Sequence, residues 1–472
     1  MSLSLAISSA LAGLRGSQAQ TSIISRNIEN AAVPGYVRQD IQLTTRVVAG
    51  VNLGLDVSVR RNVDERLLRD VRSTQSETGS LSAQKELLTR YTDTIGQPQD
   101  ERSVASLLSR LKTAFQSLVD RPGDQNFQRA VVDAAANTAA SIRTMYAAAQ
   151  QARTDADRSI QDKVAGINQG LQRIAELNRT IRGLDPNGAD VGALQDERDR
   201  LADGLSQELG VSTYLRDGDM VVMTKGGATL VDASANLLTA SPFGRVSTAD
   251  GVDLTPGGGN PNGLQDGALA GLLKIRDETM PGFQAQLDQL AAGLVSLFQD
   301  KDSTVGAPPN DTGLFTDGGK ALDPAATAGL AGRIAVNDLV RPEAGGALWR
   351  VAGGMHAAEP PASGDSRQVQ AFLDGFGEQR GFDSGVGLAA SATIEGYATG
   401  LVTAQQGART SVSSSLDARS VTLESLKSAR LGRDGVNIDD ELQKMTLVQQ
   451  SYAASAQLLS SVSQMMDTLL KI

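Results

Sequence analysis

The 472-residue sequence contains no cysteine, only one histidine, and few aromatic residues, which make up 3% of the chain. Without cysteine, the chain has no disulfide, no thiolate nucleophile and no thiolate metal ligand. The histidine, His356, stands in a stretch rich in glycine, alanine and proline. A single imidazole there provides neither a catalytic triad nor a multi-histidine metal site. The sequence therefore predicts no cofactor, no metal and no enzyme of these classes.

Acidic residues outnumber basic ones, and long apolar runs are missing. The net charge is −10, which repels phosphate backbones and anionic lipid, so nucleic acid is not an expected partner. No apolar run is long enough for a transmembrane helix, and we expect no membrane insertion. The apolar stretch Leu3–Leu14 has no basic residue before Arg15, unlike a secretory signal peptide. We expect a retained amphipathic helix there, in preference to a transit peptide, which the lack of acidic residues before Glu29 would also fit.

Proline is missing from both ends of the chain. None occurs before Pro34 or after Pro361, and ten of the fourteen lie between Pro242 and Pro361. Because proline breaks helices, long helices are expected at the two ends. The stretch from Asp124 to Arg182 has no proline either, and its apolar residues recur at spacings of three and four, as on one face of a helix. These residues are Ile142, Met145, Ala149, Ala152, Ala156, Ile160, Val164, Ile167, Leu171 and Ile174.

The middle of the chain changes in period. Short β-type runs at 211–215, 220–224 and 229–232 are separated by Asp-Gly and Gly-Gly turns, which predicts a small β-meander. Helix is expected again at 267–298, with a kink or break near Pro281, and from 388 to 429. The turn-rich segment 301–362 predicts a small irregular module that faces outward and is dispensable for the helical core. The predicted fold is mainly α, an elongated helical-bundle or coiled-coil rod formed by both chain ends, with small β-rich central modules.

The C-terminal segment carries the sharpest repeat in the chain. Ile438, Met445, Tyr452, Leu459 and Met466 follow one another at strict seven-residue intervals, which is typical of a coiled-coil seam. At the other end, apolar residues also occupy heptad-like positions. We predict an assembly interface formed by Leu3, Ile7, Leu14, Ile24, Ile28, Ile438, Leu442, Met445, Tyr452, Leu459, Met466 and Leu469.

Two interpretations of these ends stay open. They form an intramolecular helical hairpin, or a hairpin that also packs against copies of itself. The many alanine and serine residues favour the second, since they permit close approach on more than one face. They also give one partner little apolar area, so we expect both ends to be disordered in the isolated chain and to order on assembly.

Motifs at the two ends resemble those of flagellar rod, hook and hook-associated proteins. Segment 26–39 reads RNIENAAVPGYVRQ, and segment 435–442 reads GVNIDDEL. Positions 194–201 (LQDERDRL) and 271–277 (GLLKIRD) are similar to the interior of the type 1 hook-associated family, which is longer and more helical than rod and hook proteins. The resemblance is thin from 301 to 387. The motif residues carried over are Asn27, Asn30, Pro34, Gly35, Tyr36, Arg38, Gly435 and Asn437.

The resemblance implies a non-enzymatic, secreted component of the bacterial flagellum, at the junction between hook and filament and required for filament assembly. Implied partners are copies of the chain in a ring, hook protein, the second hook–filament junction protein, and an export chaperone at the C-terminal helix. Implied domains are a terminal coiled-coil assembly domain (1–33, 437–472), a helical rod (34–210, 265–300, 363–436) and a β-rich outer module (211–264, 301–362). Alternatives are another axial protein (second junction protein, hook protein or flagellin) or a flagellum-associated peptidoglycan hydrolase.

Overall fold

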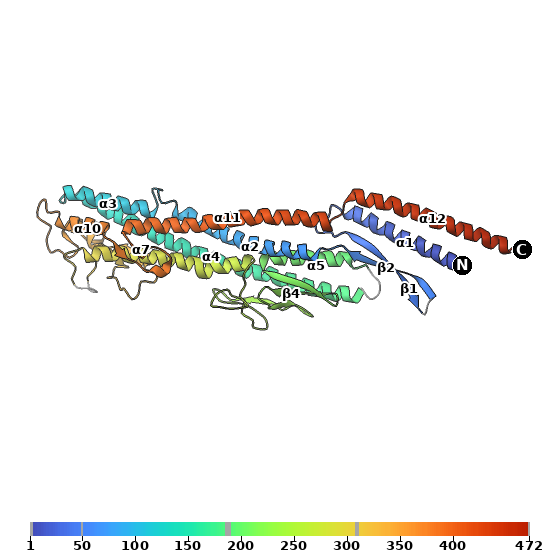
Figure 1. Ribbon diagram of the computed structural model, residues 1–472. Helices are drawn as coiled ribbons and strands as arrows, with labels where there is room; N and C mark the ends of the chain where they lie inside the picture. Colours follow the sequence, from blue (N-terminus) through green and yellow to red (C-terminus); the bar gives the residue numbers. More distant parts are fainter. Residues whose placement is uncertain (1–2, 49–50, 185–189, 307–310, 471–472) are drawn as a thin grey trace. The chain divides into compact units, whose positions relative to one another are not determined.

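The computed structural model describes residues 3–48, 51–184, 190–306 and 311–470, with the side chains of 3–6, 43–48, 51–57 and 469–470 left out. The chain is 64% helical, with long helices at both ends and small sheets between them, which confirms the mainly α prediction (Figure 1). In the described residues the strands form one three-stranded and four two-stranded sheets.

The helices and strands follow one another along the chain with these bounds. The elements are α1 (Leu3–Asn30), β1 (Gln39–Val48), β2 (Val51–Arg61), α2 (Glu65–Ile95), α3 (Val104–Asp120), α4 (Gln125–Leu184), α5 (Gly192–Glu208), β3 (Val211–Arg216), β4 (Asp219–Thr224), β5 (Thr229–Val231), β6 (Leu238–Ala240), β7 (Val246–Thr248), α6 (Ala268–Lys274), the π-helix η2 (Ile275–Thr279), α7 (Met280–Asp300), β8 (Phe315–Asp317), α8 (Leu330–Arg333), β9 (Ile334–Val336), the 3-10 helices η3 (Asp338–Val340) and η4 (Pro342–Ala344), α9 (Arg350–Gly353), α10 (Arg367–Gly377), β10 (Arg380–Gly381), the 3-10 helix η5 (Ser384–Val386), β11 (Ser391–Ala392), α11 (Ile394–Asp434) and α12 (Ile438–Leu470).

The chain divides into two compact units. Unit 1 comprises 1–80, 162–270 and 417–472, and unit 2 comprises 81–161 and 271–416. Helices α2, α4, α6 and α11 contribute residues to both. This division differs from the domains implied by the sequence, because 211–264 belongs to unit 1 and 301–362 to unit 2. Each of these segments therefore packs with the helices of its own unit.

Helix α4 confirms the expected long helix and spans 60 residues. All ten apolar residues of its predicted stripe are buried, each with 6% or less of its surface exposed. A stripe at three- and four-residue spacing stays on one face of a helix, so it supplies one continuous apolar surface to the packing.

The predicted β-meander is confirmed as the sheet β3-β4-β5 of unit 1. A buried asparagine of α4, Asn178, joins this sheet to the helices. Its Nδ2 donates to the Met220 carbonyl at 2.9 Å, and its Oδ1 accepts from the Met220 N–H at 3.0 Å. The same Oδ1 accepts from Arg198 of α5 at 2.9 Å. One amide therefore fixes the sheet against two helices.

A long β-hairpin, β1–β2, lies in a segment that the sequence analysis assigned to the helical rod. The strands pair antiparallel from Gln39↔Arg61 to Val48↔Val51, with an irregularity between Arg46 and Val47. The period-2 alternation of the apolar residues Ile41, Leu43 and Val47, with the β-branched Thr45 between them, was the available signal, because such alternation is typical of strands.

Unit 2 is built around a cluster of phenylalanines. The rings of Phe115 (α3) and Phe298 (α7) stack at 5.5 Å between centroids, and Phe372 and Phe376 of α10 pack against both. Phe315 (β8) lies 5.3 Å from Phe298 and is fully buried. Aromatic pairs in these geometries add to the stability that comes from their buried area.

Segment 301–362 is therefore part of a core, and the prediction that it is dispensable and faces outward is wrong. Besides Phe315, the residues Leu314, Leu330, Ile334 and Val351 have no exposed surface. The expectation failed because the segment has no long periodic apolar run. Short runs joined by turns bury their side chains one at a time, against α7 and neighbouring helices.

The predicted kink or break near Pro281 is a local π-turn, and helical structure continues through it. In η2 the Met280 N–H donates to the Ile275 carbonyl, five residues back. Proline lacks an N–H and its ring collides with the preceding turn of an α-helix. Widening that turn by one residue accommodates Pro281 without ending the helix.

We predict that Phe315→Ala destabilises unit 2 by about 3–5 kcal/mol, because it opens a cavity in the phenylalanine cluster. Denaturant unfolding followed by helical circular dichroism measures the loss. Phe243→Ala is the matched control, since that ring is 49% exposed and its removal should cost far less. Equal effects of the two changes would show that the cluster does not hold unit 2 together.

Candidate functional site: the junction of the chain ends

Helices α1 and α12, from opposite ends of the sequence, lie side by side in unit 1 (Figure 1). The residues of α12 buried by this pairing include Glu441, Val448 and Val462. These residues follow one another at seven-residue intervals or multiples of them, and Ser455 fills the remaining position of the series. It faces Gly13 of α1, where an added Cβ would lie only 2.9 Å from the serine Oγ. The helices therefore approach closely through small residues, as the composition of both ends suggested.

A buried asparagine, Asn27, joins the two helices where α1 ends and α12 begins. The Asn27 side chain has no exposed surface. Its Nδ2 donates to the Gln39 carbonyl at 2.9 Å and to Glu441 Oε2 at 3.0 Å. Its Oδ1 accepts from the Tyr36 hydroxyl at 2.9 Å and from the Gln39 N–H at 3.1 Å. All four hydrogen bonds that an amide side chain commonly makes are thus used, and they connect α1, β1 and α12.

The carboxylate of Glu441 is 1% exposed and is balanced by cations. Its Oε1 lies 3.1 Å from Arg38 Nε and 3.0 Å from Lys444 Nζ. A buried carboxylate is tolerated only when charge and hydrogen bonds compensate its desolvation. Burial and nearby carboxylates also raise the pKa of Tyr36 to about 12, so its hydroxyl remains a donor to Asn27.

A tight turn brings Tyr36 and Arg38 back to α1. The Tyr36 N–H donates to the Val33 carbonyl at 3.1 Å, with Pro34 and Gly35 at the two central positions. Gly35 has φ +78°, as the third residue of a type II turn requires. A Cβ at Gly35 would lie 2.8 Å from Arg200 Cγ, so any other residue would have to displace Arg200 in addition to adopting the positive φ. Before the turn, Asn30 Nδ2 donates to the Arg26 carbonyl at 2.9 Å.

The C-terminal motif residues shape the connection from α11 to α12. Asn437 precedes α12, and its Oδ1 accepts from the Asp439 N–H at 3.0 Å, which is the arrangement of a helix N-cap. A Cβ at Gly435 would lie 2.3 Å from the Leu431 carbonyl oxygen, so the chain can leave α11 there only at glycine. The N- and C-terminal motifs thus meet in one place.

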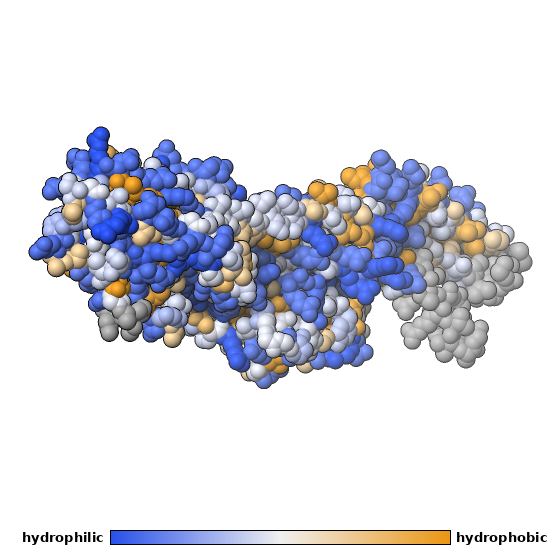
Figure 2. Space-filling model, turned by 60° about the vertical axis from the view of Figure 1, so that its left-hand side comes forward, coloured by the Kyte–Doolittle hydropathy of each residue, from blue (hydrophilic) through white to orange (hydrophobic). Residues whose placement is uncertain are grey.

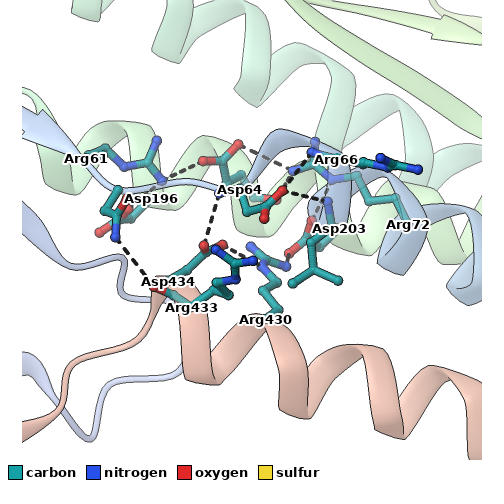
Figure 3. A network of polar contacts seen from close by, with 12 residues as sticks. Arg61, Asp64, Arg66, Arg72, Asp196, Asp203, Arg430, Arg433 and Asp434 are labelled. Atoms are coloured by element: carbon teal, nitrogen blue, oxygen red, sulfur yellow. Dashed lines mark hydrogen bonds and ion pairs between the residues drawn. The ribbon is translucent and has the colours of Figure 1, made fainter.

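An ion network extends the junction into the helices of unit 1 (Figure 3). Arg61, the last residue of β2, lies 2.7 Å from Asp196 and 2.6 Å from Asp199 of α5. Arg72 of α2 pairs with Asp203 at 2.6 Å, and Arg430 of α11 pairs with the same aspartate at 2.8 Å. These acids come from the LQDERDRL segment and its continuation, where spacings of three and four put them on one helix face.

Two carboxyls of this region carry a raised pKa. Burial raises the pKa of Asp434. The Asp64 N–H, which donates to Asp434 at 3.0 Å, and the charge of Arg430 both lower this pKa, but burial has the larger effect. Burial likewise raises the pKa of Asp196, although Arg61 stabilises its charged form. Because the α11–α12 connection and α5 both depend on these groups, the junction is sensitive to their protonation.

The predicted assembly residues divide into inner and outer groups. Ile24 is buried against the junction, and Ile7, Leu14, Ile28, Met445 and Leu459 are half-buried. The exposed fraction is 46% for Ile438, 51% for Leu442, 43% for Tyr452 and 41% for Met466. The side chains of Leu3 and Leu469 lie outside the described residues.

We call the strict heptad series of α12 the apolar ridge; its members are Ile438, Met445, Tyr452, Leu459 and Met466. These are not the residues through which α12 mainly contacts α1. The series through Glu441, Val448 and Val462 is more deeply buried. The ridge lies beside that contact line and leaves apolar surface at the outside of the pair. Figure 2 shows such hydrophobic residues among hydrophilic ones at the terminal helices.

The expected disorder of the ends is not what the structure shows, since α1 and α12 are helices packed on each other. The sequence argument weighed apolar area alone. It omitted the Asn27–Glu441 hydrogen bond and the close Gly13–Ser455 approach.

Sequence analysis also missed Glu441 and Gln39 as site residues, although both stand inside the quoted motifs. A polar residue inside an apolar heptad was the available signal for Glu441. No pattern in the sequence marks Gln39, because its backbone makes the contacts with Asn27.

Two features of the described residues concern membranes and metal ions. No helix among them is long and apolar enough to cross a membrane. They contain no cluster of three or more histidine, aspartate or glutamate side chains that could hold a metal ion.

Comparison with known proteins matches two families. The helical domain of the flagellar hook-associated protein FlgK matches residues 88–304, and the C-terminal domain of the flagellar basal body rod FlgEFG proteins matches residues 428–472. The second match contains the whole of α12 and the Glu441 end of the junction.

Curated relatives carry the same family name. Flagellar hook-associated protein 1 of Salmonella typhimurium is 28% identical over 340 residues, which are 68% of this chain and 59% of that protein. Flagellar hook-associated protein 1 of Escherichia coli is 27% identical, over 63% of this chain and 56% of that protein. The chain thus spans less than two thirds of the length of these relatives. The solved structure of the flagellar hook junction protein FlgK from Burkholderia pseudomallei is 25% identical, over 53% of this chain and 47% of that one, with a TM-score of 0.44.

We predict that Asn27→Asp loosens α12. The change keeps the size of the side chain but removes both Nδ2–H donors and places a second carboxylate against Glu441, at an expected cost of about 1–3 kcal/mol or more. Hydrogen exchange should show lost protection in α12 and unchanged protection in α4. The control is Asn30→Asp, which makes the same chemical change three residues further along α1, at a half-buried position.

The double variant Asn27→Asp/Glu441→Gln tests whether the two side chains act together. The amide introduced at position 441 then supplies the donor that the carboxylate introduced at position 27 lacks, so protection of α12 should partly return. Strictly additive losses in the double variant would contradict a direct Asn27–Glu441 interaction.

We predict a pH dependence from Asp434. Because its pKa is raised in the folded protein, the folded state binds the proton more tightly than the unfolded state. The contribution of this group to the free energy of unfolding therefore falls as pH rises from the ordinary aspartate pKa of about 4 through the folded value. Asp434→Asn should remove that part of the slope in denaturant unfolding above about pH 4, whereas Asp439→Asn, at an exposed residue, should not. Parallel profiles for wild type and Asp434→Asn would contradict the assignment.

Proposed function

We propose that this chain is a structural component of the bacterial flagellum. Parts of it match the helical domain of flagellar hook-associated proteins and the C-terminal domain of flagellar rod proteins. It occupies the junction between hook and filament and is required for filament assembly. The role is mechanical and involves no catalysis.

One observation supports this proposal most directly. The N- and C-terminal motifs converge on the Asn27–Glu441 contact, and α12 leaves that contact with an apolar ridge at its outer side. A helix pair of an isolated globular protein would bury its most apolar heptad series between its two helices. A pair that does not do so has apolar surface available for neighbouring subunits.

We propose partners in keeping with that surface. Copies of the chain associate in a ring, hook protein lies on one side and the second junction protein on the other. An export chaperone covers α12 before assembly, since Leu442, Leu447, Leu458 and Met465 are each at least half exposed. The chain is secreted through the flagellar export apparatus and stays in the flagellum.

The test is complementation of a null mutant. The null strain should build hooks, lack filaments and release filament subunits into the medium. Wild-type chain should restore filaments and motility, and immuno-electron microscopy should place the label where the hook meets the filament. Filaments of normal length on the null strain would overturn the proposal.

A point variant refines this test. Tyr452→Asp places a charge on the apolar ridge and should abolish motility, yet leave the helicity of the purified chain nearly unchanged because the residue is 43% exposed. The matched control Gln450→Asp lies on the exposed far side of α12 and should retain motility. Global unfolding of Tyr452→Asp would show that the ridge serves the fold of the chain itself.

A further inference from the structure

The sheet β3-β4-β5 of unit 1 has two outer sides, and the chain itself caps the β5 side. There the Asn236 N–H donates to the Leu230 carbonyl at 2.8 Å, and Asn236 Nδ2 donates to the Thr229 carbonyl at 3.1 Å. Further along the same side, the start of β4 is capped by Asn178, which bonds both backbone groups of Met220. On this side the chain therefore supplies hydrogen-bond partners for the backbone of the sheet.

The β3 side of the sheet carries unpaired backbone. The turn after β3 has φ +52° at Asp217 and +87° at Gly218, as a type I′ hairpin turn requires. In such a two-residue hairpin the residues next to the turn exchange both hydrogen bonds, so Arg216 and every second residue before it bond to β4. The N–H and C=O groups of Thr213 and Leu215 then point to the outer edge, where no described residue hydrogen-bonds to them.

This outer edge of β3 also lacks the features that normally prevent the addition of another strand. Edge strands are protected by charges, prolines, bulges or a covering segment. The strand 211–216 has no charge before its last residue and no proline, and its pairing with β4 is regular. The pairing of β4 with β5, in contrast, is irregular between Val222 and Met223. Tyr214 is 48% and Leu215 57% exposed, and successive residues of a strand point to opposite faces.

The charges at the end of the hairpin are already paired. Arg216 forms an ion pair with Asp232, and Asp219 forms one with Arg182 of α4. A molecule that covers the edge therefore needs no charge of its own to neutralise this end of the sheet. An uncharged segment leaves both ion pairs intact and covers the exposed apolar surface of Leu215.

We propose, on the basis of the function proposed above, that the outer edge of β3 binds an extended, uncharged segment of a different protein of the flagellum. The segment adds to the sheet as a fourth strand. An extended backbone presents alternating N–H and C=O groups at the spacing of the free groups of β3, which a helix does not do. Its side chains alternate as well, so apolar or β-branched residues pack beside Tyr214 on one face and beside Leu215 on the other.

The proposed place of the chain favours a different protein over a second copy. If β3 of one copy paired with β3 of another, the same surface would serve both, and the isologous contact would close after two subunits. A subunit at a boundary between two kinds of structure has unlike chains as neighbours. Strand addition provides affinity through the backbone, while the side chains beside Tyr214 and Leu215 provide selectivity.

The first experiment maps the occupant of the edge in assembled flagella. A photo-reactive phenylalanine analogue replaces Tyr214 in one variant of the full-length chain and Leu215 in another, each in a complemented null strain. Flagella are isolated and irradiated, and the cross-linked peptides are identified by mass spectrometry. Both positions should link to neighbouring residues of one segment of a different flagellar protein. The same analogue at Phe243, an exposed ring of unit 1 outside this sheet, is the control and should not link to that segment.

The second experiment separates backbone pairing from side-chain contact. A synthetic peptide with the sequence of the cross-linked segment is titrated against the purified full-length chain. Leu215→Ala shortens the side chain and keeps the N–H, whereas Leu215→Pro also removes the N–H that points to the edge. Leu215→Pro should bind the peptide about tenfold more weakly than Leu215→Ala, because one carbonyl of the peptide loses its donor. If hydrogen exchange shows that proline disturbs β4, Leu215→Lys replaces it, since a charge on the edge should weaken binding and keeps the backbone intact.

Three results would overturn the proposal. They are cross-links from position 214 to β3 of another copy, no cross-link from either position in flagella, and equal binding of the peptide by the alanine variant and the edge-blocking variant. The outcome is separable from that of the proposed function. Immunolabel at the hook–filament boundary without cross-links would reject strand addition alone. Cross-links to a flagellar segment together with label away from that boundary would retain strand addition and reject the location.

Discussion

The carboxylate of Glu441 is buried where three segments of the chain meet, and its desolvation has to be compensated there. Asn27, Arg38 and Lys444 provide that compensation through one hydrogen bond and two ion pairs. None of them can be moved without leaving a charge or an amide unsatisfied, which is costly in a buried site. This requirement fixes the rotation of α12 about its own axis, because Glu441 has to point toward α1. Once that rotation is set, the more apolar series through Tyr452 is directed away from the contact line.

The ion network of unit 1 transmits this constraint to the helices behind the junction. Asp203 binds Arg72 and Arg430 together, and Asp434 holds the end of α11 against the start of α2 through the Asp64 N–H. Buried ion pairs add little net stability, since desolvation offsets most of their attraction. What they supply is a defined geometry, because a slipped register would leave charges unpaired. The proposed role, in which the chain links two different partners, requires such a geometry at the chain ends.

Apolar periodicity predicted the helices well and their partners less well. The stripe of α4 from Ile142 to Ile174 is buried along its whole length, because one apolar face gives a long helix only one way to pack. On α12 the heptad period is present, but the series chosen by hydrophobicity is not the one buried against α1. Two neighbouring heptad series run along α12, one through Tyr452 and one through Glu441. Because Glu441 has to face α1, its series is the one buried between the helices. The phenylalanine cluster of unit 2 shows the same limit, since Phe315 reaches Phe298 from a segment without any period.

The sequence by itself determined the long helices, the β-meander and the two terminal motifs, because these depend on local periodicity, on proline placement and on turn residues that act within a few positions. Gly35 and Asn437 stood out in the sequence as motif residues, and the type II turn and the start of α12 that they serve are properties of the adjacent backbone. Only the tertiary structure decided which residues of the two ends meet. The Asn27–Glu441 hydrogen bond joins positions 414 residues apart, and no local pattern encodes a contact at that separation. The same holds for the groove lined by Ile23 of α1, Ile41 of β1 and Val448 of α12, which exists only when buried polar groups hold those three elements together.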